Sequence, residues 1–243
     1  MRIQRRLLTL VTLSVVGVLT AGCGGISITG SGSGTGSDGA NVEELEQTYR
    51  EPVSRLVLDS DSGTVDLSAG PDGAANVKQR LRWDQTKPEV TVAVEDDTLR
   101  VTARCPRQNN RCEVGFTITL PAATVVEATT GAGSVEATGL AGNQRLVTSA
   151  GSVTAADLNA KTVDARTSAG SIELGFAGTP QAVTAESTAG SVEITVPRDA
   201  TRYRVDADTT AGRRTVDVAT DDASERTIRA RSTAGSVTVR YVG

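Results

Sequence analysis

The feature that most constrains this chain is an Ala-Gly step, flanked by Ser or Thr, that recurs through its second half. Successive alanines of this step lie 18–23 residues apart. A period near 20 residues is typical of solenoid proteins, in which each repeat packs only against its neighbours. The copies read TSAGSV, TSAGSI and twice STAGSV in their closest form, and the six alanines are Ala132, Ala150, Ala169, Ala189, Ala211 and Ala234.

Strand patterns lie on both sides of each step. In residues 163–169, small or apolar side chains alternate with polar ones, and the alternation resumes from Ile172. A period of two indicates a strand with one buried face. The glycine supplies the backbone freedom that a tight corner needs, and the small neighbours let corners stack. The chain is therefore predicted to be all-β, a β-solenoid-like stack of two-stranded repeats of about 20 residues.

Charged residues predict the register of this stack. If successive repeats stack as parallel neighbours, Arg145 lies between Glu127 and Asp164, and opposite charges on neighbouring strands are favourable. The same alignment places Glu186 beside Asp208, which breaks the alternation. We expect ladders of paired charges along the outer face.

One repeat differs at its corner. It reads TTAGRRTV, so Arg214 stands where other copies carry an inward Val or Ile. Either a bulge or an edge lets Arg214 reach solvent, or Arg213 and Arg214 form a basic contact for a ligand. The sequence leaves both interpretations open.

The N-terminus has the organisation of a secretory signal peptide, predicted over residues 1–22. Three arginines precede an apolar run from Leu7 to Val18, which is too short to span a membrane. The segment LTAGC, ending at Cys23, resembles the lipobox of bacterial lipoproteins. That resemblance implies that Cys23 carries acyl chains such as palmitate, which anchor the protein in the cell membrane on its extracytoplasmic face. Ordinary cleavage with a free Cys23 thiol is the alternative, and Sec or twin-arginine export both remain open.

The composition of the chain after the predicted signal peptide indicates its net charge and its division into segments. From Cys23 onward the formal net charge is −7, from 22 basic and 29 acidic residues, which argues against nucleic acid as a partner. Residues 23–41 are rich in Gly and Ser and predict a flexible tether. Residues 42–243 are predicted to form a single β-repeat domain, with irregular strands over 53–121, for which a sandwich-like arrangement is the alternative, and regular repeats over 122–243. Ser62-Gly63 repeats the corner pattern inside the irregular part.

Two further cysteines predict a disulfide. With Cys23 lipidated, Cys105 and Cys112 remain as an even pair outside the cytoplasm, where disulfides persist. The chain has no Cys-x-x-Cys motif and no histidine, so a redox or metal role is the weaker interpretation.

Nothing in the sequence predicts catalysis, a metal or a cofactor. The absence of histidine excludes Ser-His-Asp and Cys-His chemistry, and the repeated serines recur as corners rather than as one distinct nucleophile. Asp59, Asp61 and Gly63 resemble the start of a calcium loop, but Gly70 stands where that loop needs a bidentate Glu. The glycines around the first corner lack dinucleotide-binding spacing.

Two carboxylate pairs leave a glycosidase alternative open. Asp96-Asp97 and Asp221-Asp222 each lie between predicted strands. A solvated turn is the ordinary explanation for such pairs, but β-helix enzymes that act on polysaccharides also use paired carboxylates.

Taken together, residues 53–243 resemble a bacterial family known as putative adhesins, a domain of unknown function. The resemblance is carried by the GSV-type corners, RLRW and TLRV, the cysteine pair, and ITLP directly before the repeats. It implies a stacked β architecture and a surface-binding module of the cell envelope, without catalysis, whose partner is an envelope protein or polysaccharide. The alternatives are a sensor or accessory of an envelope-stress or regulatory system, and a polysaccharide-active β-helix enzyme.

Overall fold

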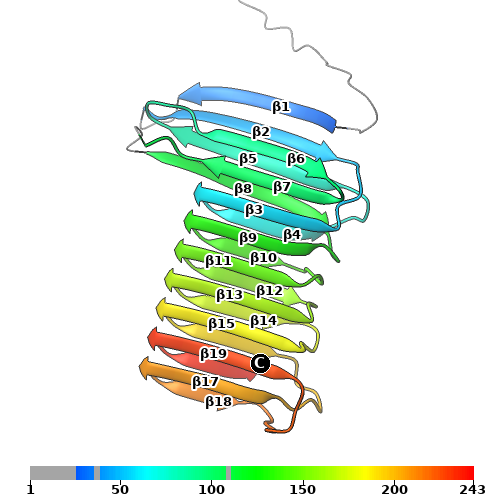
Figure 1. Ribbon diagram of the computed structural model, residues 1–243, viewed down its shortest axis with the longest axis vertical. Helices are drawn as coiled ribbons and strands as arrows, with labels where there is room; N and C mark the ends of the chain where they lie inside the picture. Colours follow the sequence, from blue (N-terminus) through cyan, green and yellow to red (C-terminus); the bar gives the residue numbers. More distant parts are fainter. Residues whose placement is uncertain (1–25, 36–38, 108–110) are drawn as a thin grey trace, which may run out of the picture.

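The structure is a computed structural model that describes residues 26–35, 39–107 and 111–243, with side chains from residue 32 onward (Figure 1). The described residues form two β-sheets that face each other across one core. They contain no helix that could cross a membrane. The predicted all-β, solenoid-like fold is confirmed.

The first sheet has eleven strands and includes most of the N-terminal segments. In spatial order its strands are β1 (Ile26–Thr35), β2 (Asn41–Tyr49), β5 (Ala75–Trp83), β8 (Cys112–Pro121), β4 (Val65–Gly70), β10 (Val135–Thr138), β12 (Val153–Leu158), β14 (Ile172–Phe176), β16 (Val192–Val196), β20 (Val237–Tyr241) and β18 (Arg214–Asp217).

The second sheet has nine strands. From the same end of the molecule its strands are β6 (Glu89–Glu95), β7 (Thr98–Arg104), β3 (Arg55–Ser62), β9 (Val125–Ala132), β11 (Gln144–Ala150), β13 (Thr162–Ala169), β15 (Ala182–Ala189), β19 (Thr227–Ala234) and β17 (Arg204–Ala211).

One strand of each sheet, joined by a corner, makes one coil of the solenoid. Partner strands follow one another in the same spatial order in both sheets. Eight coils therefore stack in parallel, from β7/β8 at one end to β17/β18 at the other. In order they are β7/β8, β3/β4, β9/β10, β11/β12, β13/β14, β15/β16, β19/β20 and β17/β18.

The core consists of columns of inward side chains, as the alternating pattern predicts. The first inward residue after the Ala-Gly corner is Val or Ile in five of the six regular coils, with at most 1% of its surface exposed. Burying each such side chain contributes about 1.5–3 kcal/mol. These residues are Val135, Val153, Ile172, Val192 and Val237.

The corner glycines lie at the closest approach between coils. Gly170 has φ +152°, and a Cβ built there would lie 2.0 Å from the carbonyl oxygen of Gly151 in the neighbouring coil. The Gly170 amide donates a 2.9 Å hydrogen bond to the carbonyl of Ala189 on its other side. Only glycine fits both the left-handed backbone and the contact.

The predicted register is correct, but the predicted order of the coils is wrong at the C-terminal end. Arg145 pairs with Glu127 on one side and with Asp164 on the other. The last coil in the sequence, β19/β20, inserts between β15/β16 and β17/β18. Arg231 therefore lies between Glu186 and Asp208, and the apparent clash between these two carboxylates disappears.

The N-terminal part is more regular than the sequence suggests. Within residues 53–121, β3/β4 and β7/β8 are full coils of the same stack, and Ser62 of the first corner pairs with Ala132. Coil β3/β4 comes first in the sequence, but β7/β8, which comes later, lies outside it in the stack. The irregularity comes from the antiparallel strands beyond β7/β8, which are β6 in one sheet and β5, β2 and β1 in the other.

The prediction of a flexible tether over residues 23–41 is wrong for residues 26–35, which form a strand. Within residues 23–41, β1 pairs antiparallel with β2, from Ile26 opposite Tyr49 to Thr35 opposite Asn41. Strand pairing uses backbone groups, which a Gly/Ser-rich segment carries like any other. Residues 26–35 are therefore the edge strand of the eleven-stranded sheet.

Candidate binding surface

The repeated corner serines are structural. In each neighbouring pair of regular coils, the hydroxyl oxygen of one corner serine accepts a hydrogen bond of 3.2–3.4 Å from the equivalent amide of the next coil. A column that repeats the same bond offers no distinct nucleophile. The acceptors are Ser134, Ser152, Ser171, Ser191 and Ser236, and the last bonds the amide of Arg213.

A second column of hydroxyls also serves the stack. Two residues before each corner alanine, an inward Thr or Ser donates to the carbonyl of a corner glycine in the neighbouring coil, at 2.7–3.4 Å. These bonds satisfy carbonyl groups that the corners would otherwise leave unpaired. The donors are Thr130, Thr148, Thr167, Ser187, Ser232 and Thr209.

A third column of hydroxyls is exposed. It stands directly before the corner alanines, on the outer face of the nine-stranded sheet, and lines a shallow groove of about 450 Å³. The groove crosses five coils, about 19 Å at a strand spacing of about 4.8 Å. The exposed hydroxyl residues are Ser149, Ser168, Thr188, Thr233 and Thr210, in stacking order.

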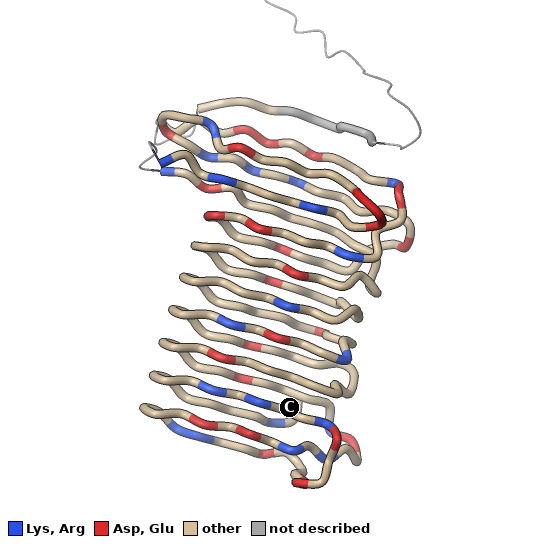
Figure 2. The backbone as a smooth tube through the Cα atoms, viewed as in Figure 1, with Lys and Arg blue, Asp and Glu red and all other residues tan. Residues whose placement is uncertain are grey.

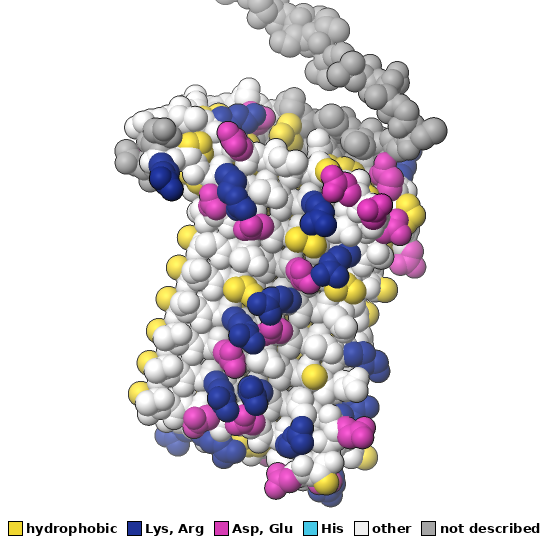
Figure 3. All heavy atoms as spheres, viewed as in Figure 1, with side chains coloured by type: hydrophobic (Ala, Val, Ile, Leu, Met, Phe, Trp, Pro, Cys, Tyr) yellow, Lys and Arg dark blue, Asp and Glu magenta, His cyan; other side chains and the backbone are white. Residues whose placement is uncertain are grey.

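The exposed corner alanines border this groove along one edge of the molecule, where Figure 3 shows a row of hydrophobic side chains. Charged side chains border it on the other side: Arg166, Glu186, Arg231 and Asp208, in stacking order. The groove is thus polar along its floor and flanked by one apolar and one charged column.

Residues of both charge signs are distributed over this face (Figure 2), and several of them form ion pairs. Asp164 accepts hydrogen bonds from Arg145 at 2.6 Å and from Arg166 at 2.8 Å, and Asp206 lies 2.8 Å from Arg231. The hydrogen bond that Arg166 donates to Asp164 raises the pKa of Arg166. Exposed pairs contribute only about 0–1 kcal/mol each to stability, so their main effect is a face with little net charge.

The eleven-stranded sheet presents a different face. Asp66 and Glu136 are neighbours on its outer surface, and so are Glu173 and Glu193. Only Glu193 of these four has an ion pair among the described residues, 2.6 Å from Arg240. Neighbouring carboxylates repel each other and repel anionic partners, so this face is acidic where the nine-stranded face is balanced.

A larger groove, of about 670 Å³, lies near the N-terminal end of the eleven-stranded sheet. Glycine at position 115 leaves room in its floor. Its basic side chains are paired: Lys78 lies 3.6 Å from Glu46, and Arg80 lies 3.3 Å from Glu44. A ligand would have to displace these pairs.

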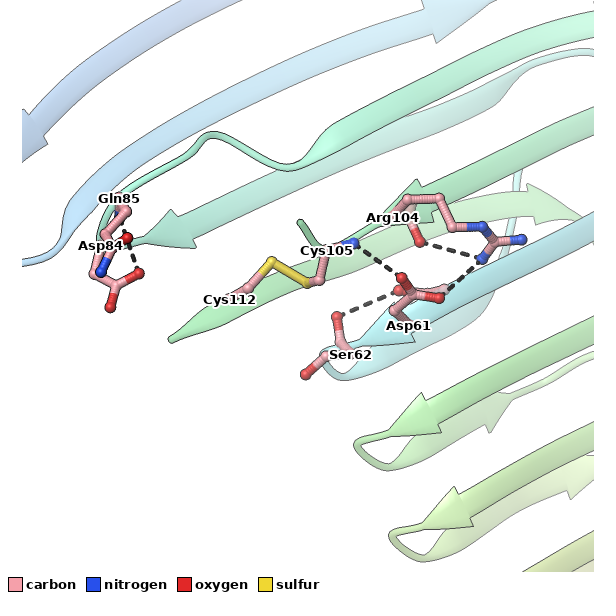
Figure 4. The surroundings of a disulfide bond; sticks show 9 residues. Asp61, Ser62, Asp84, Gln85, Arg104, Cys105 and Cys112 are labelled. Carbon is pink, nitrogen blue, oxygen red and sulfur yellow. Dashed lines mark hydrogen bonds and ion pairs between the residues drawn. A yellow bond between two sulfur atoms is a disulfide. The ribbon is translucent and has the colours of Figure 1, made fainter. Parts of the chain in front are cut away.

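Cys23, the predicted lipidation site, lies outside the described residues. Cys105 and Cys112 are joined by a disulfide at the corner of the β7/β8 coil (Figure 4). This link takes the place that an Ala-Gly step has in the regular coils. The amide of Cys105 donates a 2.9 Å hydrogen bond to Asp61, which ties this corner to the β3/β4 corner.

The carboxylates that resemble a calcium loop belong to an ion-pair cluster. Arg104 lies 3.2 Å from Asp61 and donates a 3.1 Å hydrogen bond to Asp59. Bonding to Arg104 holds the pKa of Asp59 below its usual value. Among the described residues no group of three potential metal-ligating side chains occurs.

Both carboxylate pairs lie in turns. Asp96 and Asp97 have φ of 48° and 59° and join β6 to β7. The Asp221 side chain accepts a 2.9 Å hydrogen bond from the amide of Ala223. Left-handed backbone and local bonding are ordinary turn roles for Asp.

The structure separates the two arginines of the divergent corner. The amide of Arg213 continues the serine column, whereas the Arg214 side chain donates from Nε to the carbonyl of Ala207, 2.8 Å away. Arg214 lies on β18, the outermost strand, so the edge interpretation agrees with its position. A ligand contact formed by both arginines stays a prediction.

The exposed hydroxyl column was not predicted from the sequence. Its signal was present, because Ser or Thr precedes the corner alanine in five of the six copies, with Gly131 in the other. Alternation alone indicates that these positions point outward. It does not show that a groove runs beside them, because that depends on which coils are adjacent.

The second half of the chain matches a known protein family. The family described as Toastrack DUF4097 matches residues 117–241. This match covers about half of the chain and confirms the family resemblance. No curated protein matches the sequence.

Solved structures also match the chain at low sequence identity. A putative cell adhesion protein from Clostridium sporogenes has 12% identity and a TM-score of 0.46, covering 90% of this chain and 100% of its own. A putative adhesin from Bacteroides fragilis has 16% identity and a TM-score of 0.44, covering 82% and 97%. A putative lipid binding protein from Parabacteroides distasonis has 12% identity and a TM-score of 0.35, covering 86% and 99%.

Proposed function

This chain belongs to the Toastrack DUF4097 family, and from that premise we propose that it is a non-catalytic binding module, held at the cell membrane by lipid on Cys23. The observation that carries the proposal is that the three columns of repeated hydroxyls have different roles. The hydroxyls of two columns form hydrogen bonds between coils, whereas those of the third column line an open groove across five coils.

Anchoring is supported by the lipobox-like sequence and by the position of β1. Cys23 precedes the first residue of β1 by three positions, which is at most about 11 Å of extended chain. Strand β1 lies at one end of the stack, and β17/β18 lie at the other (Figure 1). Acyl chains on Cys23 would hold the β1 end near the membrane, and the groove would run outward from it.

Binding without catalysis is supported by the chemistry of the groove. Its floor consists of serine and threonine hydroxyls, and its charged border carries both signs. Such a surface suits an extended polar partner, either a polysaccharide or a protein segment of the envelope. The absence of histidine removes the usual general base.

Lipidation is tested by replacing Cys23 with serine in the full-length protein. We expect Cys23→Ser to abolish incorporation of a labelled palmitate analogue and to move the protein from the membrane to the soluble fraction, because serine cannot form the thioether. Cys112→Ser is the matched control and should keep both the label and the membrane location. Label retained in Cys23→Ser would contradict the anchor.

The groove is tested with a charged side chain placed on its floor. We expect Thr188→Lys in the full-length, detergent-solubilised protein to reduce capture of envelope polysaccharide or protein at least about tenfold, since the new ammonium obstructs the groove. Thr154→Lys adds the same charge on the opposite sheet and should leave capture unchanged. Protease treatment of the envelope fraction identifies the partner class. Equal capture by both variants would remove the groove from the proposal.

A further inference from the structure

The two ends of the stack differ. At the N-terminal end both sheets continue into antiparallel strands, β6 in one and β5, β2 and β1 in the other. At the other end β17 and β18 are outermost, and no described strand pairs with their outer edges. Just before β17, Tyr203 forms an isolated parallel bridge with Thr220, which covers the start of that edge and leaves the rest of it open. A free edge is a ready template for pairing with another chain, and natural proteins protect such edges.

The core is also incompletely covered at this end. Val205 and Val216 are half-buried, whereas their neighbours in the next coil, Ile228 and Val239, are fully buried. Half-buried apolar residues beside unpaired backbone groups make a surface that a second copy of this chain would fit. A two-fold axis perpendicular to the sheets would pair β17 with β17 and β18 with β18 and extend both sheets.

Arg214 stands at an inward position of the outermost coil, where such an interface would form. It replaces the inward Val or Ile of the other regular coils, and it pairs in register with Val237, which is fully buried. An inward-pointing charge is one of the recognised devices that protect edge strands. In a two-fold interface the Arg214 side chains of both copies would enter the apolar seam and lose water.

The hydrogen bond of Arg214 strengthens this protection. The Arg204 amide donates to Arg226, on the β19 side of the strand, at 2.8 Å. Alternate residues of a strand direct their backbone groups to opposite neighbours, so Ala207 directs its carbonyl toward the free edge. Arg214 Nε binds this carbonyl at 2.8 Å and thereby occupies an acceptor that a second copy would need.

We propose that Arg214 is a built-in cap that keeps the β17/β18 end from pairing with a second copy of this chain. This inference does not depend on the proposed binding function. The groove ends on the same coil, but it is lined by outward side chains of β17, whereas the cap acts on the free strand edge.

The test restores the repeat pattern at position 214. We expect the full-length protein in detergent to be monomeric by sedimentation velocity, and Arg214→Val to dimerise with at least about a hundredfold tighter self-association, since the unfavourable charge is removed from the seam. Arg213→Val, the matched control, removes a neighbouring exposed arginine and should stay monomeric.

A second variant separates pairing from misfolding. Adding Val216→Lys to Arg214→Val returns an inward charge to the same edge strand and should restore the monomer, whereas a misfolded aggregate would not be rescued. The proposal is overturned if Arg214→Val stays monomeric, if Arg213→Val dimerises equally, if the double variant still associates, or if the unmodified protein is already a dimer through this end.

Discussion

Gly170→Ala is expected to lower the free energy of unfolding by about 4 kcal/mol or more, a loss that only a few mechanisms produce. The residue has φ +152°, and the added Cβ would lie 2.0 Å from the carbonyl oxygen and 2.5 Å from the carbonyl carbon of Gly151. The backbone strain alone costs about 1–3 kcal/mol. The contact cannot relax easily, because coils on both sides hold the corner. Equilibrium urea unfolding of the full-length protein measures the change.

The matched control lies in the same coil. Gly175 is in β14, and a Cβ there would meet its nearest atom, Thr195 Oγ1, at an ordinary 3.5 Å. Gly175→Ala should therefore be neutral or stabilising, by up to about 1 kcal/mol, since alanine suits a strand interior better than glycine. If both substitutions have the same small effect, the corners are not the tight contacts described above.

Removal of the last coil in the sequence is expected to abolish cooperative folding of the C-terminal half. Deleting residues 227–243 removes β19 and β20 from between β15/β16 and β17/β18. Three fully buried branched side chains go with them: Ile228, Val237 and Val239. At about 1.5–3 kcal/mol each, their loss is comparable to the whole stability of a typical domain, about 5–15 kcal/mol. Circular dichroism and limited proteolysis report the outcome.

A longer deletion at the outer coil provides the comparison. Removing residues 202–226 deletes β17 and β18 and joins Val196 to Thr227 through residues 197–201. Residues 177–181 make the same connection between β14 and β15, so the shortened chain has the geometry of a regular repeat. We expect this variant to fold with a single unfolding transition. If the longer deletion is the more damaging one, β19/β20 is not an interior coil.

Much of this architecture can be predicted from the local sequence. The period of two fixes which side chains point inward, and the Ala-Gly step fixes where each coil turns, because only glycine fits the stacked corner. The recurrence of both fixes the register, so that Arg145 lies between Glu127 and Asp164. These features depend on residues close together in the chain.

The candidate site was less accessible to sequence reasoning. The corner serines were predicted to be structural, and their hydrogen bonds agree with that interpretation. The exposed column that includes Thr188 was visible only as a weak preference for Ser or Thr. A groove arises when such residues become neighbours across five coils, and adjacency is a tertiary property.

The order of the coils was decided by the tertiary structure alone. Periodicity gives every coil the same inward face, so β15/β16 could accept either β17/β18 or β19/β20 as its neighbour. Long-range electrostatics and connection length distinguish the two. The stacked order places Arg231 between Glu186 and Asp208, and residues 197–203 and 218–226 are long enough to pass a coil.

The sequence by itself thus determined the building unit: two strands, a glycine corner and a small apolar core. Which unit lies at each end, and therefore which edge Arg214 protects, was decided only when distant segments packed together. The physical reason is that strands pair through backbone groups, which are the same in every coil. Contacts between side chains far apart in the sequence therefore determine which coils become neighbours.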